Sequence, residues 1–162
     1  MTTTLVIISL LLAVGGVSAV CGSGIPESIS SMVYSLKKGH QWLWSVWLFI
    51  ISILLMPRLL ELTQWVGWIT IACLIGVAVT PIIREETRNI HNWLGIAAGI
   101  MSQVCVAWIC PWWLFLWILM VCAIALDFAD GGYDKEHEVL RGKGVFIAEI
   151  ICMVTLYAAI LT

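Results

Sequence analysis

The side chains that could do chemistry gather in short charged stretches of an otherwise apolar chain. Asp127, Asp130 and Asp134 lie in one stretch, His91 closes another, and Glu149 stands inside the last apolar run. Carboxylate oxygens are the ligands that hard divalent cations such as Mg²⁺ prefer. These five residues are therefore the candidate metal ligands. Solvation explains the loop carboxylates equally well, because charge clusters between helices usually face water.

A partial motif accompanies the aspartates. The run Asp127-Phe128-Ala129-Asp130-Gly131-Gly132 resembles the opening of the motif of CDP-alcohol phosphatidyltransferases, which are also six-helix membrane proteins that hold divalent metal with carboxylates. The remainder of the motif is absent, since Ala148 and Cys152 stand where its second pair of aspartates would be. The chain is therefore not assigned to that family, and nothing in the sequence requires a cofactor.

Glu149 is the acidic residue that lies well inside a predicted span. A charged side chain there costs about 2.5–3.5 kcal/mol on insertion scales, so it usually marks a partner or a pathway. It follows Val145 by four residues, which is about 6 Å along a helix axis. We expect its carboxylate to turn into the bundle and to meet a polar partner, His91 or Asp127 being nearest by depth. The alternative is that it reaches interfacial water.

Four basic residues are candidates for binding anions or lipid headgroups. Arg84 and Arg88 stand four residues apart, with His91 three residues further, so the three can share one helix face. Lys37 and Lys38 form a second basic pair. Such groups bind acidic headgroups, but they also arise simply because cytoplasmic loops are rich in Lys and Arg.

The composition determines what elements must position these residues. Hydrophobic residues make up 62% and charged residues 11% of the 162 residues, and the mean hydropathy is +1.04. A soluble domain carries about 25% charged residues, so most of this surface must face lipid. The net charge of -2 gives no reason to expect nucleic acid. The bilayer is the expected partner, and one membrane domain is expected to fill residues 1–162.

Six segments are apolar over the roughly 17 to 25 residues that a membrane helix needs. They cover residues 4–20, 41–59, 63–83, 92–109, 111–126 and 145–161. The predicted fold class is therefore all-α, a polytopic transmembrane bundle of about six helices. Pro111 requires a turn at the fourth boundary, because proline disfavours helical geometry in the residue before it.

A short amphipathic helix is predicted over residues 27–38. Ile29, Met32, Val33 and Leu36 follow the i, i+3, i+4, i+7 pattern of one helix face. Such a helix would lie in the cytoplasmic interface. It could instead extend the second membrane helix inward.

Three short runs resemble a known group of proteins. The runs are Ile25–Ser30, Leu55–Pro57 and Phe146–Ile150, together with a histidine that opens the fourth predicted helix. They are similar to uncharacterised small polytopic membrane proteins of Bacteroidetes and their mobile elements. The resemblance covers most of the chain. It implies the six-helix architecture and no particular activity, and it would place Glu149 and His91 among the recurring features.

Function is less constrained than fold. We predict a non-enzymatic pore, transport or membrane-assembly component, because the sequence contains no nucleophile–base arrangement and no complete metal motif. Small residues such as Gly95 and Gly99 permit close helix contacts, within the chain or in a homo-oligomer. One alternative is a metal-dependent membrane enzyme that acts on a phosphorylated or lipid substrate at the cytoplasmic face. Another is a membrane effector encoded by a phage or plasmid.

We predict that the protein lies in the cytoplasmic (inner) membrane. Both of its termini are expected on the side away from the cytoplasm. The first, third and fifth loops hold seven of the eight Lys and Arg residues, and the second loop holds only Arg58. Basic loops stay in the cytoplasm. A reporter enzyme that works only outside the cytoplasm should be active when fused after Thr162. Activity of a cytoplasm-only reporter at the same position would contradict the orientation.

Overall fold

The computed structural model describes residues 2–21, 28–30, 32–36, 39–83, 88–129 and 144–162. All regular elements within these ranges are helices. Their bounds are α1 Thr2–Cys21, α2 Met32–Ser35, α3 Gln41–Thr63, α4 Trp65–Ile83, α5 Arg88–Ile109, the 3₁₀ helix η2 Pro111–Phe115, α6 Leu116–Ala129 and α7 Gly144–Leu161. The six predicted spans each fall on one of the long helices, so the all-α class is confirmed.

Among the described residues, four helices are long and apolar enough to cross a membrane, judged by length and composition. They are α1 over Thr2–Ala19, α3, α5 over Asn89–Ile109, and α7. Helix α4 adds a shorter apolar stretch, Trp65–Pro81. The chain is therefore a multi-pass helical membrane protein, as its composition predicts.

The joint between α3 and α4 is tighter than the sequence predicted. Helix α3 continues to Thr63, where a polar loop after residue 59 was expected, and Gln64 alone separates it from α4. The Arg58 guanidinium pairs with the Glu61 carboxylate at 3.1 Å across one helical turn, and the Thr63 hydroxyl donates to the Leu59 carbonyl at 2.7 Å. The polar residues thus satisfy one another on the helix. Gln64 reverses the chain with a φ of 53°.

The predicted turn before Pro111 is confirmed, but it shortens the helix that follows. Helix α5 ends at Ile109, and Cys110 is extended with φ −154° and ψ 87°. Pro111 then opens the 3₁₀ helix η2, and α-helical geometry resumes only at Leu116. The α-helical part of the fifth predicted span therefore has 14 residues.

The prediction of one amphipathic helix over residues 27–38 is wrong in extent and in location. Within the described residues, only Met32–Ser35 is helical, and Ile29 and Ser30 form a turn. Met32 and Val33 are fully buried and pack with Val17 of α1 rather than facing lipid. The segment is held inside the bundle because Glu149 binds its backbone N–H groups, as described below.

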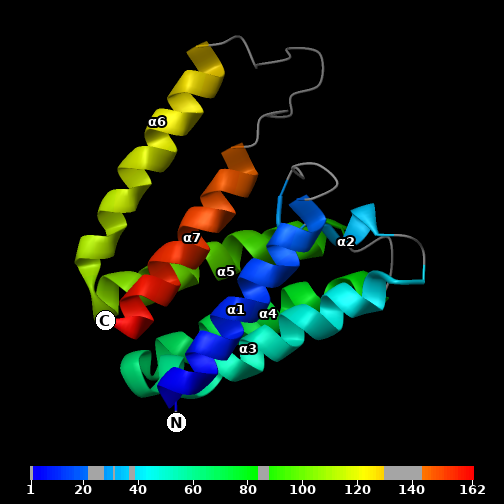
Figure 1. Cartoon of the computed structure of the whole chain (residues 1–162), viewed down its shortest axis with the longest axis horizontal. Coiled ribbons are helices and arrows are strands. Elements are labelled where there is room, and N and C mark those ends of the chain that lie inside the picture. The colour runs from blue at the N-terminus through cyan, green and yellow to red at the C-terminus, as the bar shows by residue number, and fades with distance from the viewer. Residues whose placement is uncertain (1, 22–27, 31, 37–38, 84–87, 130–143) are drawn as a thin grey trace.

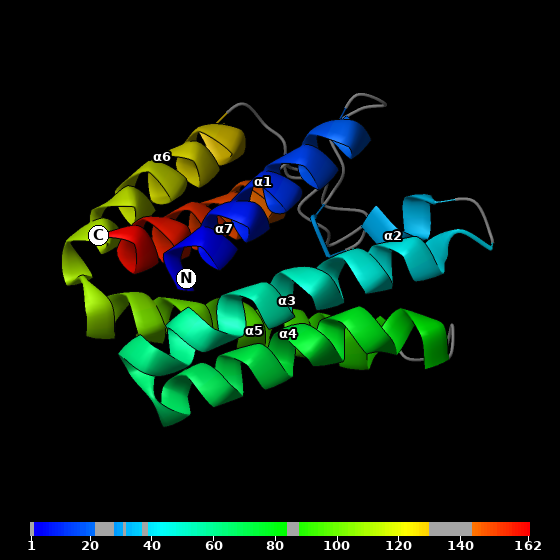
Figure 2. The ribbon, with the colours of Figure 1, turned by 60° about the horizontal axis from the view of Figure 1, so that its bottom comes forward.

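The helices form two groups that pack face to face (Figures 1 and 2). Helices α3, α4 and α5 lie side by side in chain order, and α1 and α7 cover them. Helix α6 lies at the edge of the bundle and packs mainly on α7. Both termini lie at one end of the bundle, together with the α3–α4 joint.

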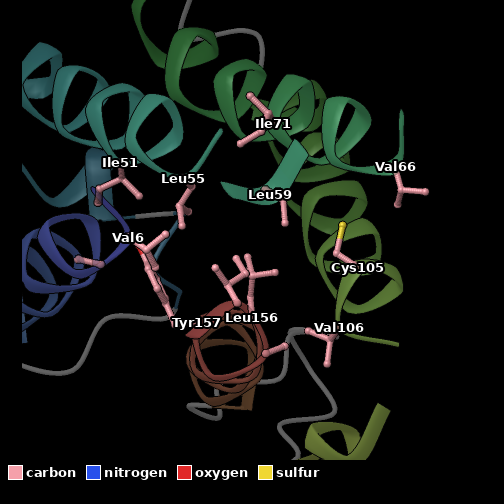
Figure 3. Close-up of a cluster of buried hydrophobic side chains, with 13 residues drawn as sticks. Val6, Ile51, Leu55, Leu59, Val66, Ile71, Cys105, Val106, Leu156 and Tyr157 are labelled. Atoms are coloured by element: carbon pink, nitrogen blue, oxygen red, sulfur yellow. The ribbon is translucent and has the colours of Figure 1, made fainter. Parts of the chain in front are cut away.

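The hydrophobic core joins five of the six long helices (Figure 3). Its labelled members are Val6 of α1, Ile51, Leu55 and Leu59 of α3, Val66 and Ile71 of α4, Cys105 and Val106 of α5, and Leu156 and Tyr157 of α7. Among its polar contacts is a pair of hydroxyls. The hydroxyls of Ser9 and Tyr157 are 2.6 Å apart, and the Ser9 hydroxyl also lies 3.4 Å from the Ile51 carbonyl. This contact links α1 to both α7 and α3.

We predict that Ser9→Ala destabilises the bundle more than Tyr157→Phe. Removing the Ser9 hydroxyl leaves the buried Tyr157 hydroxyl unpaired, which should lower the free energy of unfolding by about 1–3 kcal/mol. Tyr157→Phe leaves the Ser9 hydroxyl bonded to the Ile51 carbonyl, so the loss should be about 0.5–1.5 kcal/mol. Thermal unfolding in detergent measures the stability of both variants. Adding Tyr157→Phe to Ser9→Ala should cost nothing further. Strict additivity would show that the two hydroxyls do not interact.

Candidate functional site

The Glu149 carboxylate is bound by a turn from the other end of the sequence. The Ser30 hydroxyl donates to Oε1 at 2.7 Å, and the Ser30 backbone N–H donates to Oε2 at 3.3 Å. The Ile29 backbone N–H also donates to Oε2. We call residues Ile29 and Ser30 the latch turn. The expectation of an inward carboxylate with a polar partner is met, and among the described side chains and backbone groups the partner is the latch turn and not His91.

His91 holds the same turn from the opposite side. Its imidazole is fully buried, and Nε2 lies 3.0 Å from the Ser30 carbonyl oxygen. Because a carbonyl can only accept, Nε2 must carry a proton. The Nδ1 atom lies 2.9 Å from the Thr80 hydroxyl of α4. Ser30 is thus fixed between α7, through Glu149, and α5, through His91.

Glycines on α5 allow these close approaches. A Cβ on Gly95 would lie 3.9 Å from the Ser30 side chain, and a Cβ on Gly99 would lie 3.9 Å from the Cys152 sulfur of α7. Larger side chains at either position would push the latch turn or α7 away from α5. The close contacts predicted for these small residues are therefore made within one chain, and they need no second copy.

A cavity of about 160 Å³ lies inside the bundle beside Glu149. It is lined by the latch turn and by residues of α1, α3, α4, α5 and α7. Glu149 is the charged residue in this lining, and Trp44, Trp47 and Tyr157 are its aromatic residues. Trp44 is 5% exposed, and its indole N–H finds no acceptor among the described residues. The cavity is thus an apolar chamber with one carboxylate in its wall.

A larger groove, of about 670 Å³, lies on the other side of Glu149. It runs between α5, α7 and the η2–α6 segment, and it shares Gly95, Gly99, Glu149 and Cys152 with the cavity. Glu149 therefore lines both the cavity and the groove.

Gln103 is a site residue that the sequence analysis missed. Its Oε1 accepts from the Trp117 indole N–H at 2.8 Å and from the Thr155 hydroxyl at 3.1 Å. Its Nε2 donates to the Cys152 carbonyl at 3.3 Å. One amide thereby joins α5, α6 and α7 along the groove. A lone glutamine in an apolar span was the available signal, because polar side chains in membrane helices usually bond across helices. Ser30, in a loop, gave no such signal.

The structure does not describe the side chains of the other predicted site residues. Asp127 lies in α6 and Arg88 begins α5, and the structure does not describe their side chains. Asp130, Asp134, Arg84, Lys37 and Lys38 lie outside the described residues. In the described part of the chain, no group of three or more His, Cys, Asp or Glu side chains could hold a metal ion. A metal site at the fifth loop, and anion binding by the basic residues, both stay predictions.

Comparisons with models of protein families, with curated proteins and with solved structures find no match to this chain. The helices and their hydropathy therefore define its class, a multi-pass helical membrane protein.

We predict that Glu149→Gln preserves the latch turn and that Glu149→Leu releases it. Glutamine keeps a carbonyl oxygen for the two backbone N–H groups, and its amide can donate to the Ser30 hydroxyl, whereas leucine offers nothing. Each donor left unpaired costs about 1–3 kcal/mol where it is buried. Hydrogen exchange at Ile29 and Ser30 should accelerate most in the leucine variant and less in the glutamine variant, whose neutral amide accepts weaker hydrogen bonds. Equal exchange in both variants would mean that Glu149 does not hold the turn.

Proposed function

We propose that the protein is a transport component of the cytoplasmic membrane, in which Glu149 takes up and releases a proton or another small cation. One observation carries the proposal: a carboxylate within an apolar helix lines both a cavity among the helices and a larger groove beside it. Ionisable groups at such positions mark ion and substrate pathways in membrane proteins.

In this proposal all six long helices cross the bilayer, with both termini extracytoplasmic. The length of the shortest one supports this placement. Five residues of η2 and 14 of α6, at about 2.0 and 1.5 Å per residue, span about 31 Å, close to the hydrocarbon thickness of about 30 Å. The location of both termini at one end of the bundle agrees with an even number of crossings.

The latch turn would couple the charge of Glu149 to access. The ionised carboxylate accepts three hydrogen bonds from the turn. Bonds to an ionised acceptor are roughly twice as strong as neutral ones, so protonation of the carboxylate weakens this hold. Ile29 and Ser30 line the cavity, and their release would therefore open it at that end. His91 keeps its bond to the Ser30 carbonyl and limits how far the turn moves.

A transport role fits this geometry better than a pore or an assembly role. A pore needs a continuous polar path, whereas the cavity beside Glu149 is lined mostly by apolar side chains. A protein that only holds other subunits together would need no carboxylate that binds and releases a proton or cation. The bilayer is the one partner that the apolar helices require.

We predict that Glu149→Gln abolishes proton flux through the purified protein. In vesicles that contain a pH-sensitive dye, a membrane potential should drive proton entry at a rate at least about tenfold above that of the variant, because an amide cannot carry a proton in this range. Glu61→Gln is the matched control, since it removes a carboxylate that is 54% exposed and paired with Arg58 on the surface of α3. Equal flux in wild type and Glu149→Gln would refute the proposal.

A further inference from the structure

The size of the internal cavity limits what can occupy it. A cavity of about 150 Å³ lined by apolar side chains stays dry and accepts benzene in a well-studied case. The cavity beside Glu149 has about 160 Å³ and a similar lining, including Ile51, Leu55 and Leu156. Its occupant therefore has an apolar body of about one six-membered ring.

The charge of the residues that line the cavity limits the charge of its occupant. Each donor that reaches Glu149 within the described residues is neutral, namely two backbone N–H groups and one hydroxyl. An ionised carboxylate offers about four acceptor sites, and donors among the described residues reach three of them. The cavity lining adds no positively charged side chain. A cationic donor that enters from the cavity would therefore complement the charge of Glu149.

Aromatic side chains favour the same occupant. The rings of Trp44 and Trp47 lie 4.5 Å apart between centroids, and both residues line the cavity with Tyr157. Aromatic faces attract organic cations, by about 0.5–2 kcal/mol according to how far the cation is desolvated. The buried Trp44 N–H, which lacks an acceptor among the described residues, can donate weakly to the π face of an aromatic ligand.

We infer that the cavity binds a small organic monocation, an ammonium group on an aromatic body of one ring, with the ammonium at Oε1 of Glu149 and the ring among Trp44, Trp47 and Tyr157. The inference rests on the proposed transport function, for which it names the substrate class. The cation and a proton compete for the Glu149 carboxylate, and either can occupy it alone. The groove lined by Gly99 and Cys152 provides the second side from which Glu149 is reached.

Two probes of equal shape test the charge requirement. Benzylammonium and ethylbenzene differ only in an ammonium group that replaces a methyl group. Equilibrium dialysis against the protein in lipid nanodiscs, with binding to empty nanodiscs subtracted, should show benzylammonium bound at least about tenfold more tightly than ethylbenzene. This comparison uses the wild-type protein, so it does not depend on a variant that folds. Equal binding of the two probes, or no binding of benzylammonium, would overturn the inference.

Variants then locate the site. Glu149→Gln should lower benzylammonium affinity at least about tenfold and leave that of ethylbenzene unchanged. Glu61→Gln should change neither affinity. Loss of binding in both variants, or in neither, would show that the cation binds elsewhere and would also overturn the inference.

Flux measurements separate this inference from the proposed function. If benzylammonium fails to bind while proton flux still depends on Glu149, the substrate class is wrong and the transport function stands. If benzylammonium binds at Glu149 but neither it nor a proton crosses the vesicle membrane, the binding site stands and the transport function is wrong.

Discussion

The bonds between Glu149 and the latch turn are the interaction on which the rest of the site depends. A carboxylate inside an apolar helix is unfavourable unless polar groups satisfy it, and the described helices bring no cation to it. The donors come from Ile29 and Ser30, which are 120 and 119 residues away in the sequence. Because these donors bind the Glu149 carboxylate, the loop segment that carries them lies inside the bundle. This position explains why α2 is one buried turn and not a surface helix.

Helix α5 carries three residues that leave room for, or bond to, the segments around Glu149. Its residues 95, 99 and 103 recur every four positions and therefore lie on one face. Gly95 leaves room for Ser30, Gly99 leaves room for Cys152, and Gln103 bonds to α6 and α7. Two small residues and one amide thus set how closely three other segments approach. In lipid, where water cannot satisfy polar groups, such interhelical bonds replace hydration.

The cavity and the groove follow from this packing. The latch turn and α7 cannot fill the space beside Trp44 and Trp47, so an apolar chamber remains next to the carboxylate. Helix α6 packs on α7 at the edge of the bundle and leaves the groove beside α5. One titratable group then faces two spaces, and this arrangement, more than any single residue type, makes exchange the function that the geometry supports best.

Hydropathy determined the membrane class and the six long helices, because the cost of exposing apolar groups to water, or charged groups to lipid, acts on each segment separately. The same cost, applied to the last apolar segment, identified Glu149 as a charged residue that needs a polar partner. Only the tertiary structure decided its partners: His91 and Asp127 were nearest by depth, yet Ser30 lies between Glu149 and His91 and binds both. It also decided that residues 29 and 30 leave the helical pattern of residues 27–38. A periodic pattern tells which side chains share a face, but which distant segment meets that face depends on the packing of whole helices.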